Sequence, residues 1–298
     1  MNVQFGEHQL EMGGKYLTEL RDSNDVIDDW TALRGRLQED GYLLIRNFHD
    51  RDLVLNAKAE FLQALHEMGR LDPAFPVEQG VIGQSNKSAM WGGGAEELQD
   101  RFPAFLQVVN SDRVMDFFTR LLGGPVLTYD YKWPRAVGHG GSTGAHYDIV
   151  YMGRGTKNVY TMWTPMDDIP MEQGTLAMCL GSQHFAKVKA TYGQLDVDRD
   201  NVIDGWLSKD PVDIVEKFGG KWATTNFSAG DVIIFGMFML HASLINTTNR
   251  YRISSDTRYQ LAAEPVDERW IGRRPKGHYA WGKTPGKSME DARRMWGL

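Results

Sequence analysis

The sequence predicts a mainly β fold with flanking helices, and two contrasting parts of the chain support this class. Residues 26–125 contain several segments whose apolar side chains recur at helical spacing. Residues 126–262 contain short runs rich in β-branched and aromatic residues, separated by Gly, Pro, Asn and Asp, which is typical of an antiparallel sandwich or barrel. Because 298 residues fit one large β unit, we expect a single domain over residues 1–298.

The first part is expected to contain three helices and one strand. Asp40 and Gly41 mark a turn before the strand. Gly69 and Gly123 follow the second and third helices, and glycine favours the left-handed conformation that often ends a helix. In chain order, the expected elements are a helix over 26–38, a strand over 42–48, a helix over 51–68, a loop-like region over 70–100 and a helix near 103–122.

The second part is expected to supply six strands, interrupted by a polar and helical insertion over about 185–222. An irregular tail covers 263–298. Its last residues, 287–298, could form a short helix that packs on this domain or on a neighbouring molecule. The six strand-like runs cover 125–133, 145–152, 158–166, 174–181, 231–244 and 250–262.

The composition excludes some classes of partner. A net charge of −6 gives no broad basic field for nucleic acid or an anionic membrane, and no apolar run approaches the roughly 20 residues of a membrane span. We expect the basic residues in 268–283 to form a local loop patch that keeps the tail soluble. The single cysteine, Cys179, lies in an apolar run, which predicts a buried, unreactive thiol and a reducing compartment. Without a secretory signal, the expected protein is soluble and cytoplasmic.

His146 and Asp148 lie two residues apart in the run GAHYDIVYM (144–152). On a strand, side chains two apart point to one face. Three explanations stand: a solvated surface pair, a hydrogen-bonded core pair, or two ligands of a metal. His241, at the end of a long apolar strand-like run, is by itself best explained as a core histidine. Taken together, two histidines and one carboxylate on inward-facing strand positions of a small barrel form the facial triad that binds non-haem Fe(II).

Arg252 lies eleven residues beyond His241, in RYRISSDTRYQ (250–260). Strand alternation places it on the same face as Arg250, Ser254, Asp256, Arg258 and Gln260. Both faces of this strand carry polar groups, so hydrophobicity does not assign the buried face. An inward-facing Arg252 would need an anion, because burying an unpaired charge is unfavourable. The alternatives are an internal Arg252–Asp256 pair and an outward-facing arginine.

The sequence resembles the Fe(II)/2-oxoglutarate dioxygenases of the phytanoyl-CoA dioxygenase type over about residues 26–262. The resemblance rests on Arg252 and on the stretches DGYLLIRNF, TGAHYD, MWTPMDDIPMEQGTLAMCLGSQH and AGDVIIFGMFMLHAS. It implies a double-stranded β-helix, the cupin-like jelly roll, over 126–262. It also implies Fe(II), 2-oxoglutarate and O₂ as cofactors, with His146, Asp148 and His241 as the iron ligands.

The resemblance assigns further residues. Arg252 and Ser243 would hold the distal carboxylate of 2-oxoglutarate, and Trp163 and Thr175 match positions near it. Thr143 stands where relatives often carry a glutamine. The glycine-rich loops 86–94 and 151–156 are expected near the mouth of the site. The substrate-contact candidates are Trp91, Tyr151 and, on the strand face of Arg252, Arg258.

The implied reaction couples oxidative decarboxylation of 2-oxoglutarate to oxidation of a C–H bond in a small organic molecule such as a secondary metabolite. Hydroxylation is the expected outcome, while desaturation, cyclisation or peroxidation can use the same residues. Asp148 argues against halogenation, because halide would need the position of its carboxylate. Two alternatives stand: a cupin-like metal oxygenase or isomerase without 2-oxoglutarate, in which Arg252 has no evident task, and a non-catalytic binding barrel. Both a monomer and a homodimer are compatible with the sequence.

Overall fold

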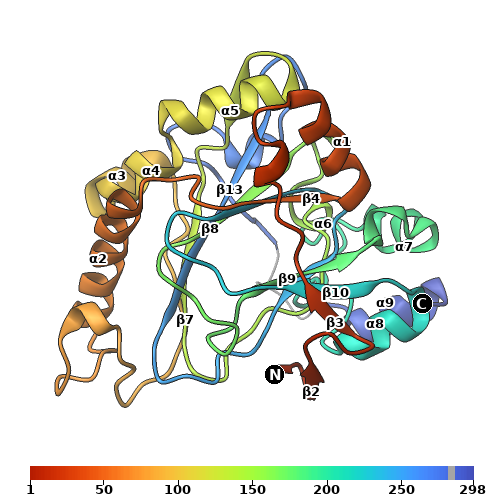
Figure 1. The fold of residues 1–298 in the computed structure, drawn as a ribbon. Helices are drawn as coiled ribbons and strands as arrows, with labels where there is room; N and C mark the ends of the chain where they lie inside the picture. Colours follow the sequence, from red (N-terminus) through yellow and green to blue (C-terminus); the bar gives the residue numbers. More distant parts are fainter. Residues whose placement is uncertain (281–285) are drawn as a thin grey trace.

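The computed structural model describes residues 1–280 and 286–298, and its centre is a seven-stranded sheet (Figure 1). Along its main path the strand order is β4-β11-β8-β13-β7-β5, and β6 pairs with β13. The pairs within this sheet are antiparallel. Its strands are β4 (Tyr42–Ile45), β5 (Ala89–Met90), β6 (Val126–Thr128), β7 (Trp133–Val137), β8 (Tyr160–Pro165), β11 (Val232–Gly236) and β13 (Arg252–Leu261).

A smaller sheet has the order β12-β9-β10-β3. Its strands are β3 (Leu17–Glu19), β9 (Leu176–Leu180), β10 (Lys221–Thr224) and β12 (His241–Ser243). The N-terminal β1 (Asn2–Phe5) and β2 (His8–Glu11) form a separate hairpin. The expected class, mainly β with the cupin-like jelly-roll architecture, is confirmed. The sequence left open a sandwich or a barrel, and the described strands form open sheets rather than a closed ring.

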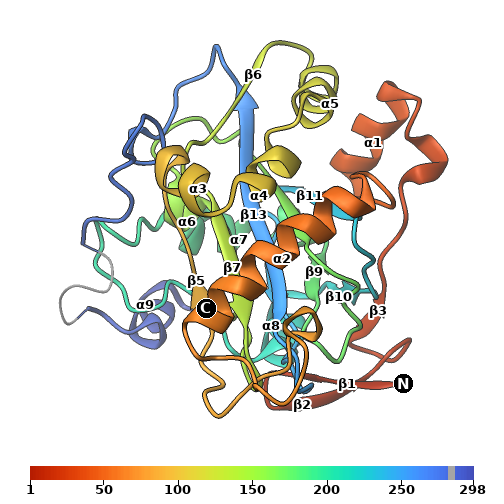
Figure 2. The same cartoon turned by 90° about the vertical axis from the view of Figure 1, so that its left-hand side faces the viewer.

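Helices cover the outer face of the large sheet, and Figure 2 shows α2 lying across β13 and β7. The amphipathic helices bury their apolar faces there. Ile253 of β13 packs in the cluster that contains α2 and α4, and Tyr259 stacks on Phe118 of α5 with ring centroids 4.0 Å apart. The covering helices are α1 (Trp30–Asp40), α2 (Arg51–Glu67), α3 (Ala95–Arg101), α4 (Pro103–Val109) and α5 (Asp112–Leu122).

This covering decides which face of β13 is internal. Ile253 and Tyr259 have odd numbers and point to the helices, so the even-numbered side chains point to the other face of the sheet. Arg252, Asp256 and Arg258 therefore line an internal cavity. The alternation in the sequence predicted this set correctly, whereas the choice of face depends on helices that are distant in the sequence.

Three expected strands are wrong in detail. The run 125–133 is a strand only over β6, and the next strand, β7, begins at Trp133. The run 231–244 breaks after Gly236 into β11 and β12, which belong to different sheets. The run 145–152 forms an isolated bridge at His146 and then the short helix α6 (Ile149–Met152). Periodicity does not distinguish a short apolar strand from one buried helical turn, and Asp148 already has helical dihedral angles.

Three expectations that concern helices also change. The region over 70–100, expected to be loop-like, contains the strand β5 and most of the helix α3. The helix near 103–122 is two helices, because Ser111 is extended, with φ −61° and ψ 152°. The insertion is helical as expected and contains α7 (Ala186–Ala190) and α8 (Pro211–Phe218), although its end is strand β10. The chain also contains single 3-10 turns at Asn24–Val26, Val77–Gln79, Ser182–His184, Tyr192–Gln194 and Glu268–Trp270.

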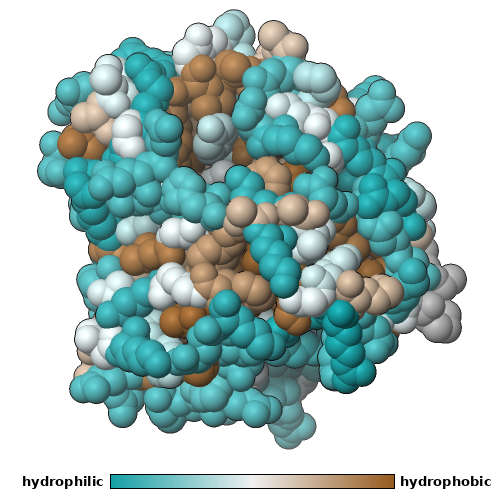
Figure 3. Space-filling model, turned by 90° about the vertical axis from the view of Figure 1, so that its right-hand side faces the viewer, coloured by the Kyte–Doolittle hydropathy of each residue, from teal (hydrophilic) through white to brown (hydrophobic). Residues whose placement is uncertain are grey.

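The tail ends in α9 (Met289–Trp296), which packs on its own chain. Arg293 pairs with Asp213 of α8 at 2.6 Å, and Met289 belongs to the main core. Figure 3 shows mostly hydrophilic residues on the face that lies to the right in Figure 1, with apolar residues between them. Among the described residues, no helix is both long and apolar enough to cross a membrane.

Candidate metal centre

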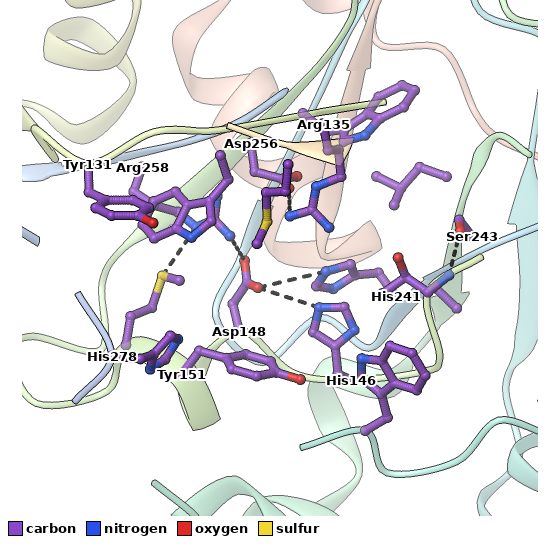
Figure 4. A pocket seen from close by; sticks show the side chains of 18 of the residues that line it. Tyr131, Arg135, His146, Asp148, Tyr151, His241, Ser243, Asp256, Arg258 and His278 are labelled. Carbon is purple, nitrogen blue, oxygen red and sulfur yellow. Dashed lines mark hydrogen bonds and ion pairs between the residues drawn. The ribbon is translucent and has the colours of Figure 1, made fainter. Parts of the chain in front are cut away.

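His146, Asp148 and His241 converge between the two sheets (Figure 4). Their ligand atoms lie within 4.8 Å of one another. Asp148 Oδ1 is 3.7 Å from Nε2 of His146 and 3.8 Å from Nε2 of His241. The two histidines are neighbours because their backbones form a bridge with N–H···O distances of 3.0 and 3.1 Å. The expected inward grouping therefore exists, but Asp148 reaches it from the start of α6 rather than from a strand.

The second ring nitrogen of each histidine is already engaged. Nδ1 of His146 lies 2.8 Å from the carbonyl oxygen of Gly144, and Nδ1 of His241 lies 3.0 Å from that of Met239. A carbonyl only accepts, so each Nδ1 carries the proton and each Nε2 presents its lone pair to the gap. Burial lowers the pKa of His146 to about 3 and lowers the pKa of His241 as well. Both imidazoles are thus neutral at pH 7, as metal ligation requires.

The two carboxylate oxygens of Asp148 have different surroundings. Oδ1 faces the histidines, whereas Oδ2 accepts a hydrogen bond from the Thr161 hydroxyl and pairs with Nη2 of Arg258 at 3.1 Å. Burial alone would raise the pKa of Asp148, but the nearby positive charge, first that of Arg258, holds it well below its usual range. The ionised carboxylate is therefore oriented to present one oxygen toward the gap.

Arg258 is itself fixed. It is 4% exposed, its guanidinium lies 4.8 Å from the ring centroid of Trp133, and its Nε contacts Met152 Sδ at 3.2 Å. The sequence suggested Arg258 as a substrate contact. The structure places it on the cavity wall with one donor committed to Asp148.

The donor set fits a divalent transition metal. Two neutral imidazole nitrogens and one carboxylate oxygen approach from one side, which is the arrangement that suits non-haem Fe(II) and leaves the opposite coordination positions open. All three residues line a cavity of about 260 Å³. A metal bound between them would therefore be accessible to small molecules.

Arg252 lies in the same cavity and is 2% exposed. Its Nη1 donates to Ser254 Oγ at 2.8 Å, while its buried Nε has no hydrogen-bond partner among the described residues. Burial and then the charge of Arg135 lower the pKa of Arg252 to about 9, so it is still positively charged at pH 7. The internal Arg252–Asp256 pair, an alternative from the sequence, is not formed: Asp256 pairs with Arg135 at 2.6 Å.

Of the four other residues expected to contact 2-oxoglutarate, three line the cavity and one does not. Ser243, Thr143 and Trp163 line the cavity, and the Thr143 N–H donates to Ser243 Oγ at 2.8 Å. Thr175 is fully buried, shares a 2.8 Å hydrogen bond with the Thr224 hydroxyl and is not among the lining residues.

Of the two remaining candidates for substrate contact, one lines the cavity and the other does not. Tyr151 lines the cavity, and its hydroxyl donates to the carbonyl oxygen of Asp204 at 2.8 Å. Trp91 stacks on Phe61 at 5.4 Å in the cluster beneath α2 and does not line the cavity. Its neighbour Met90 does, because successive residues of a strand face opposite sides.

Sequence reasoning missed much of the cavity wall. Alternation along β7 could have grouped Trp133 with Arg135 once that strand was known to pair with β13. Trp206 comes from the insertion and His278 from the tail, and no local pattern marks either of them. The lining residues that were not predicted are Met90, Tyr131, Trp133, Arg135, Met152, Leu176, Trp206, Ala242 and His278.

The expectation for the basic residues in 268–283 is partly wrong. Arg273 is exposed as expected, but Arg269 is buried and binds both Asp198 and Asp267 at 2.6 Å. Asp198 also accepts from His278 Nδ1 at 2.9 Å. This ion network joins the insertion to the tail beside the cavity. Residues 281–283 of the predicted patch lie outside the described residues.

Cys179 is buried as predicted. Burial raises the pKa of its thiol to about 12. The thiol is therefore protonated at neutral pH and a poor nucleophile.

Comparison with known proteins agrees with this architecture. The family model "Phytanoyl-CoA dioxygenase (PhyH)" matches residues 37–254. A 1-deoxypentalenic acid 11-beta-hydroxylase from Streptomyces exfoliatus is 25% identical over 259 residues, covering 83% of this chain and 87% of the relative. Its counterpart from Streptomyces arenae is 24% identical over 260 residues, covering 83% and 86%.

Solved structures show the same fold. The epimerase SnoN in complex with Fe³⁺, alpha ketoglutarate and nogalamycin RO superposes with a TM-score of 0.57 at 17% identity, covering 88% of this chain and 98% of that one. EctD from S. alaskensis in its apoform gives a TM-score of 0.57 at 16% identity, covering 91% of each chain. The carbocyclase SnoK from nogalamycin biosynthesis gives 0.55 at 17% identity, covering 82% and 86%.

Proposed function

Because this chain belongs to the phytanoyl-CoA dioxygenase family and is an Fe(II)/2-oxoglutarate-dependent enzyme, we propose that His146, Asp148 and His241 bind its iron. The observation that carries this assignment is the convergence of two deprotonated Nε2 atoms on one carboxylate oxygen, Asp148 Oδ1. Each ligand is oriented by a second contact: a backbone carbonyl for each histidine, and Thr161 with Arg258 for the aspartate.

Arg252 is proposed to anchor the distal carboxylate of 2-oxoglutarate. The guanidinium is buried, charged and without an ion-pair partner among the described residues, and a carboxylate would satisfy it. Ser243 and Thr143 lie on the same cavity wall, and Ser243 is the second proposed contact. This surplus cation also disfavours the alternative of a metal enzyme without 2-oxoglutarate, in which nothing would neutralise Arg252.

The protein then binds and orients the reactants and excludes water. When bound, iron would activate O₂, and 2-oxoglutarate would supply two of the electrons that O₂ needs as it is decarboxylated to succinate, so that a C–H bond of the substrate can be oxidised. The histidines stay neutral, and Arg258 holds Asp148 ionised. Tyr131, Trp133 and Trp206 give the cavity an aromatic wall on which an apolar substrate can rest.

The proposed reaction is hydroxylation of a small organic molecule of secondary metabolism. Two relatives in sequence are hydroxylases, and two structural neighbours are the epimerase SnoN and the carbocyclase SnoK of nogalamycin biosynthesis, which supports this proposal. We place the enzyme in the cytoplasm, in keeping with its single, buried thiol.

Succinate formation tests this function. Purified protein is incubated with Fe(II), 2-oxoglutarate and O₂, with and without a panel of candidate metabolites, and succinate is quantified. Succinate that requires both added iron and 2-oxoglutarate is expected. His146→Ala and His241→Ala should abolish it while the circular dichroism spectrum is kept. Full activity in either variant would contradict the metal assignment.

A matched control is His139→Ala, which removes a solvent-exposed histidine that does not belong to the group of proposed metal ligands. This variant should retain wild-type succinate formation.

A further inference from the structure

The cavity would keep a net positive charge after a metal ion and 2-oxoglutarate have bound in it. Among the described residues, the lining carries three guanidinium groups and two carboxylates, which leaves one positive charge. His146 and His241 would bind the metal as neutral imidazoles, because each Nδ1 already donates to a backbone carbonyl, and burial lowers the pKa of His278, so the three lining histidines add none. A metal dication adds two positive charges and dianionic 2-oxoglutarate removes two. One positive charge remains, and an unbalanced charge in a poorly solvated site favours an anionic ligand.

Among the lining guanidinium groups, Arg135 has donors to spare and is tied neither to a proposed metal ligand nor to 2-oxoglutarate. Arg258 also has a buried Nη1 without a hydrogen-bond partner among the described residues, but it is paired with Asp148, and Arg252 is the proposed anchor of 2-oxoglutarate. Arg135 meets Asp256 through Nη2 alone, at 2.6 Å, and its buried Nε has no hydrogen-bond partner among the described residues. A guanidinium can bind a carboxylate with two parallel N–H donors, so this single-point pair does not exhaust it.

Arg135 also stands where a substrate would meet it. It projects into the cavity from β7, opposite the histidines (Figure 4). Trp133, two residues earlier on this strand, shares its face, and Met90 of β5 is its partner in register. Tyr131 lies against Trp133, with ring centroids 4.8 Å apart. An apolar wall therefore borders a guanidinium that has unused donors.

We propose that Arg135 is a specificity-determining residue that binds a carboxylate of the substrate, whose apolar body rests against Tyr131, Trp133 and Met90. The substrate class is therefore a compact hydrophobic monocarboxylic acid. Asp256 orients Arg135 from one side and leaves its remaining donors toward the cavity. This inference rests on the proposed function, because it assigns the surplus charge to the substrate only after metal and 2-oxoglutarate are counted.

Binding of matched acid and amide probes tests the inference. Protein loaded with Mn(II) and 2-oxoglutarate, without O₂, is titrated calorimetrically with 1-naphthoic acid and with 1-naphthamide. These probes share one ring system and differ in charge. The acid should bind about tenfold or more tightly, the difference expected for hydrogen bonds to a charged group. Equal affinities, or no binding of either probe, overturn the inference.

Variants locate the effect. Arg135→Gln should remove the preference for the acid, and Arg135→Lys should keep part of it. The double variant Arg135→Gln/Asp256→Asn removes both charges together, so it avoids an unpaired buried carboxylate and should also lose the preference. Arg51→Gln, which breaks an exposed pair with Asp168, is the matched control and should keep it.

A second titration separates this inference from the proposed function. Arg135→Gln should bind 2-oxoglutarate within about twofold of wild type. If it instead loses 2-oxoglutarate affinity as severely as an Arg252 variant, Arg135 serves the cosubstrate and the inference fails, while the proposed function stands. If wild-type protein does not bind 2-oxoglutarate at all, the proposed function fails.

Discussion

Arg252 and Arg250 lie two residues apart and differ in burial, so they can be compared directly for their effect on 2-oxoglutarate binding. Arg252 is buried in the cavity, whereas Arg250 is exposed just before β13 begins. Loss of one partner from a desolvated charge pair typically costs about 2 to 5 kcal/mol, or roughly 30-fold to several thousand-fold in affinity. Arg252→Ala should therefore weaken 2-oxoglutarate binding by at least the lower factor, measured by calorimetry in the presence of Mn(II). The affinity for Mn(II) should hardly change.

Arg250→Ala is the control and should bind 2-oxoglutarate as wild type does. An undiminished affinity in Arg252→Ala would show that the buried charge serves another ligand.

Arg258 leads to a different expectation, because it contacts Asp148, a proposed metal ligand, whereas Arg252 has no ion-pair partner among the described residues. Groups that orient metal ligands typically contribute 10- to 100-fold to metal affinity. Arg258→Gln should thus weaken Mn(II) binding by about that factor, as measured by calorimetry without 2-oxoglutarate. Arg252→Ala serves as the control. A loss of 2-oxoglutarate affinity with unchanged Mn(II) affinity would instead favour the substrate-side role suggested by the sequence.

At the scale of elements, one face of β13 packs against the helices and stabilises the fold, whereas the other face lines the cavity. Tyr259 stacks on Phe118 on the helix side, and Phe118 is fully buried. Truncating a buried phenylalanine typically costs about 3 to 5 kcal/mol. Phe118→Ala should lower the free energy of unfolding by about that amount in a urea titration. The folded fraction should keep wild-type affinity for 2-oxoglutarate, because the cavity lies on the opposite face.

Phe75→Ala truncates a phenylalanine that is 45% exposed and should cost less than about 0.5 kcal/mol. A similar loss in both variants would mean that the Phe118–Tyr259 stack is not a specific support of the sheet.

The same strand shows how far the sequence can predict the site. Alternation correctly grouped Arg252, Asp256 and Arg258, because a period of two is a local property. The internal face could not be chosen, since it depends on α2, α4 and α5 packing from elsewhere in the chain. The triad was predicted from residue types and the resemblance, although Asp148 begins a helical turn where a strand was expected.

On the scale of the whole molecule, buried histidines link stability to pH. His49 is 7% exposed, and burial, then the charge of Arg113, lowers its pKa to about 3. In the unfolded chain the pKa is about 6.5. The unfolded state therefore binds more protons between these values, so this stability is complete above pH 6.5 and is lost as the pH falls toward 3. The slope approaches about 1.4 kcal/mol per pH unit for each such group.

His49→Gln should flatten the fall in unfolding free energy between pH 6.5 and 4, measured by urea titration of metal-free protein. His66→Gln changes an exposed histidine on α2 and should keep the wild-type slope. If the His49 variant also kept that slope, protonation of His49 would not be coupled to unfolding.

Parts of the chain that are distant in the sequence meet at the cavity, and local sequence patterns could not predict which of their residues line it. Trp206 from the insertion and His278 from the tail both line it. Arg269 of the tail binds Asp198 of the insertion as well as Asp267, and no local pattern in the sequence predicts this contact.

The contact between insertion and tail has a consequence for engineering this enzyme. The insertion and the tail supply part of the cavity wall, whereas the proposed iron ligands come from other stretches of the chain, so this part of the wall can be redesigned without replacing those ligands. The insertion and the tail are not separable modules, however. Asp198 belongs to the insertion, whereas its partners Arg269 and His278 belong to the tail, so replacing the tail alone would leave a buried carboxylate without these partners. A chimaera should therefore exchange the insertion and the tail as a pair.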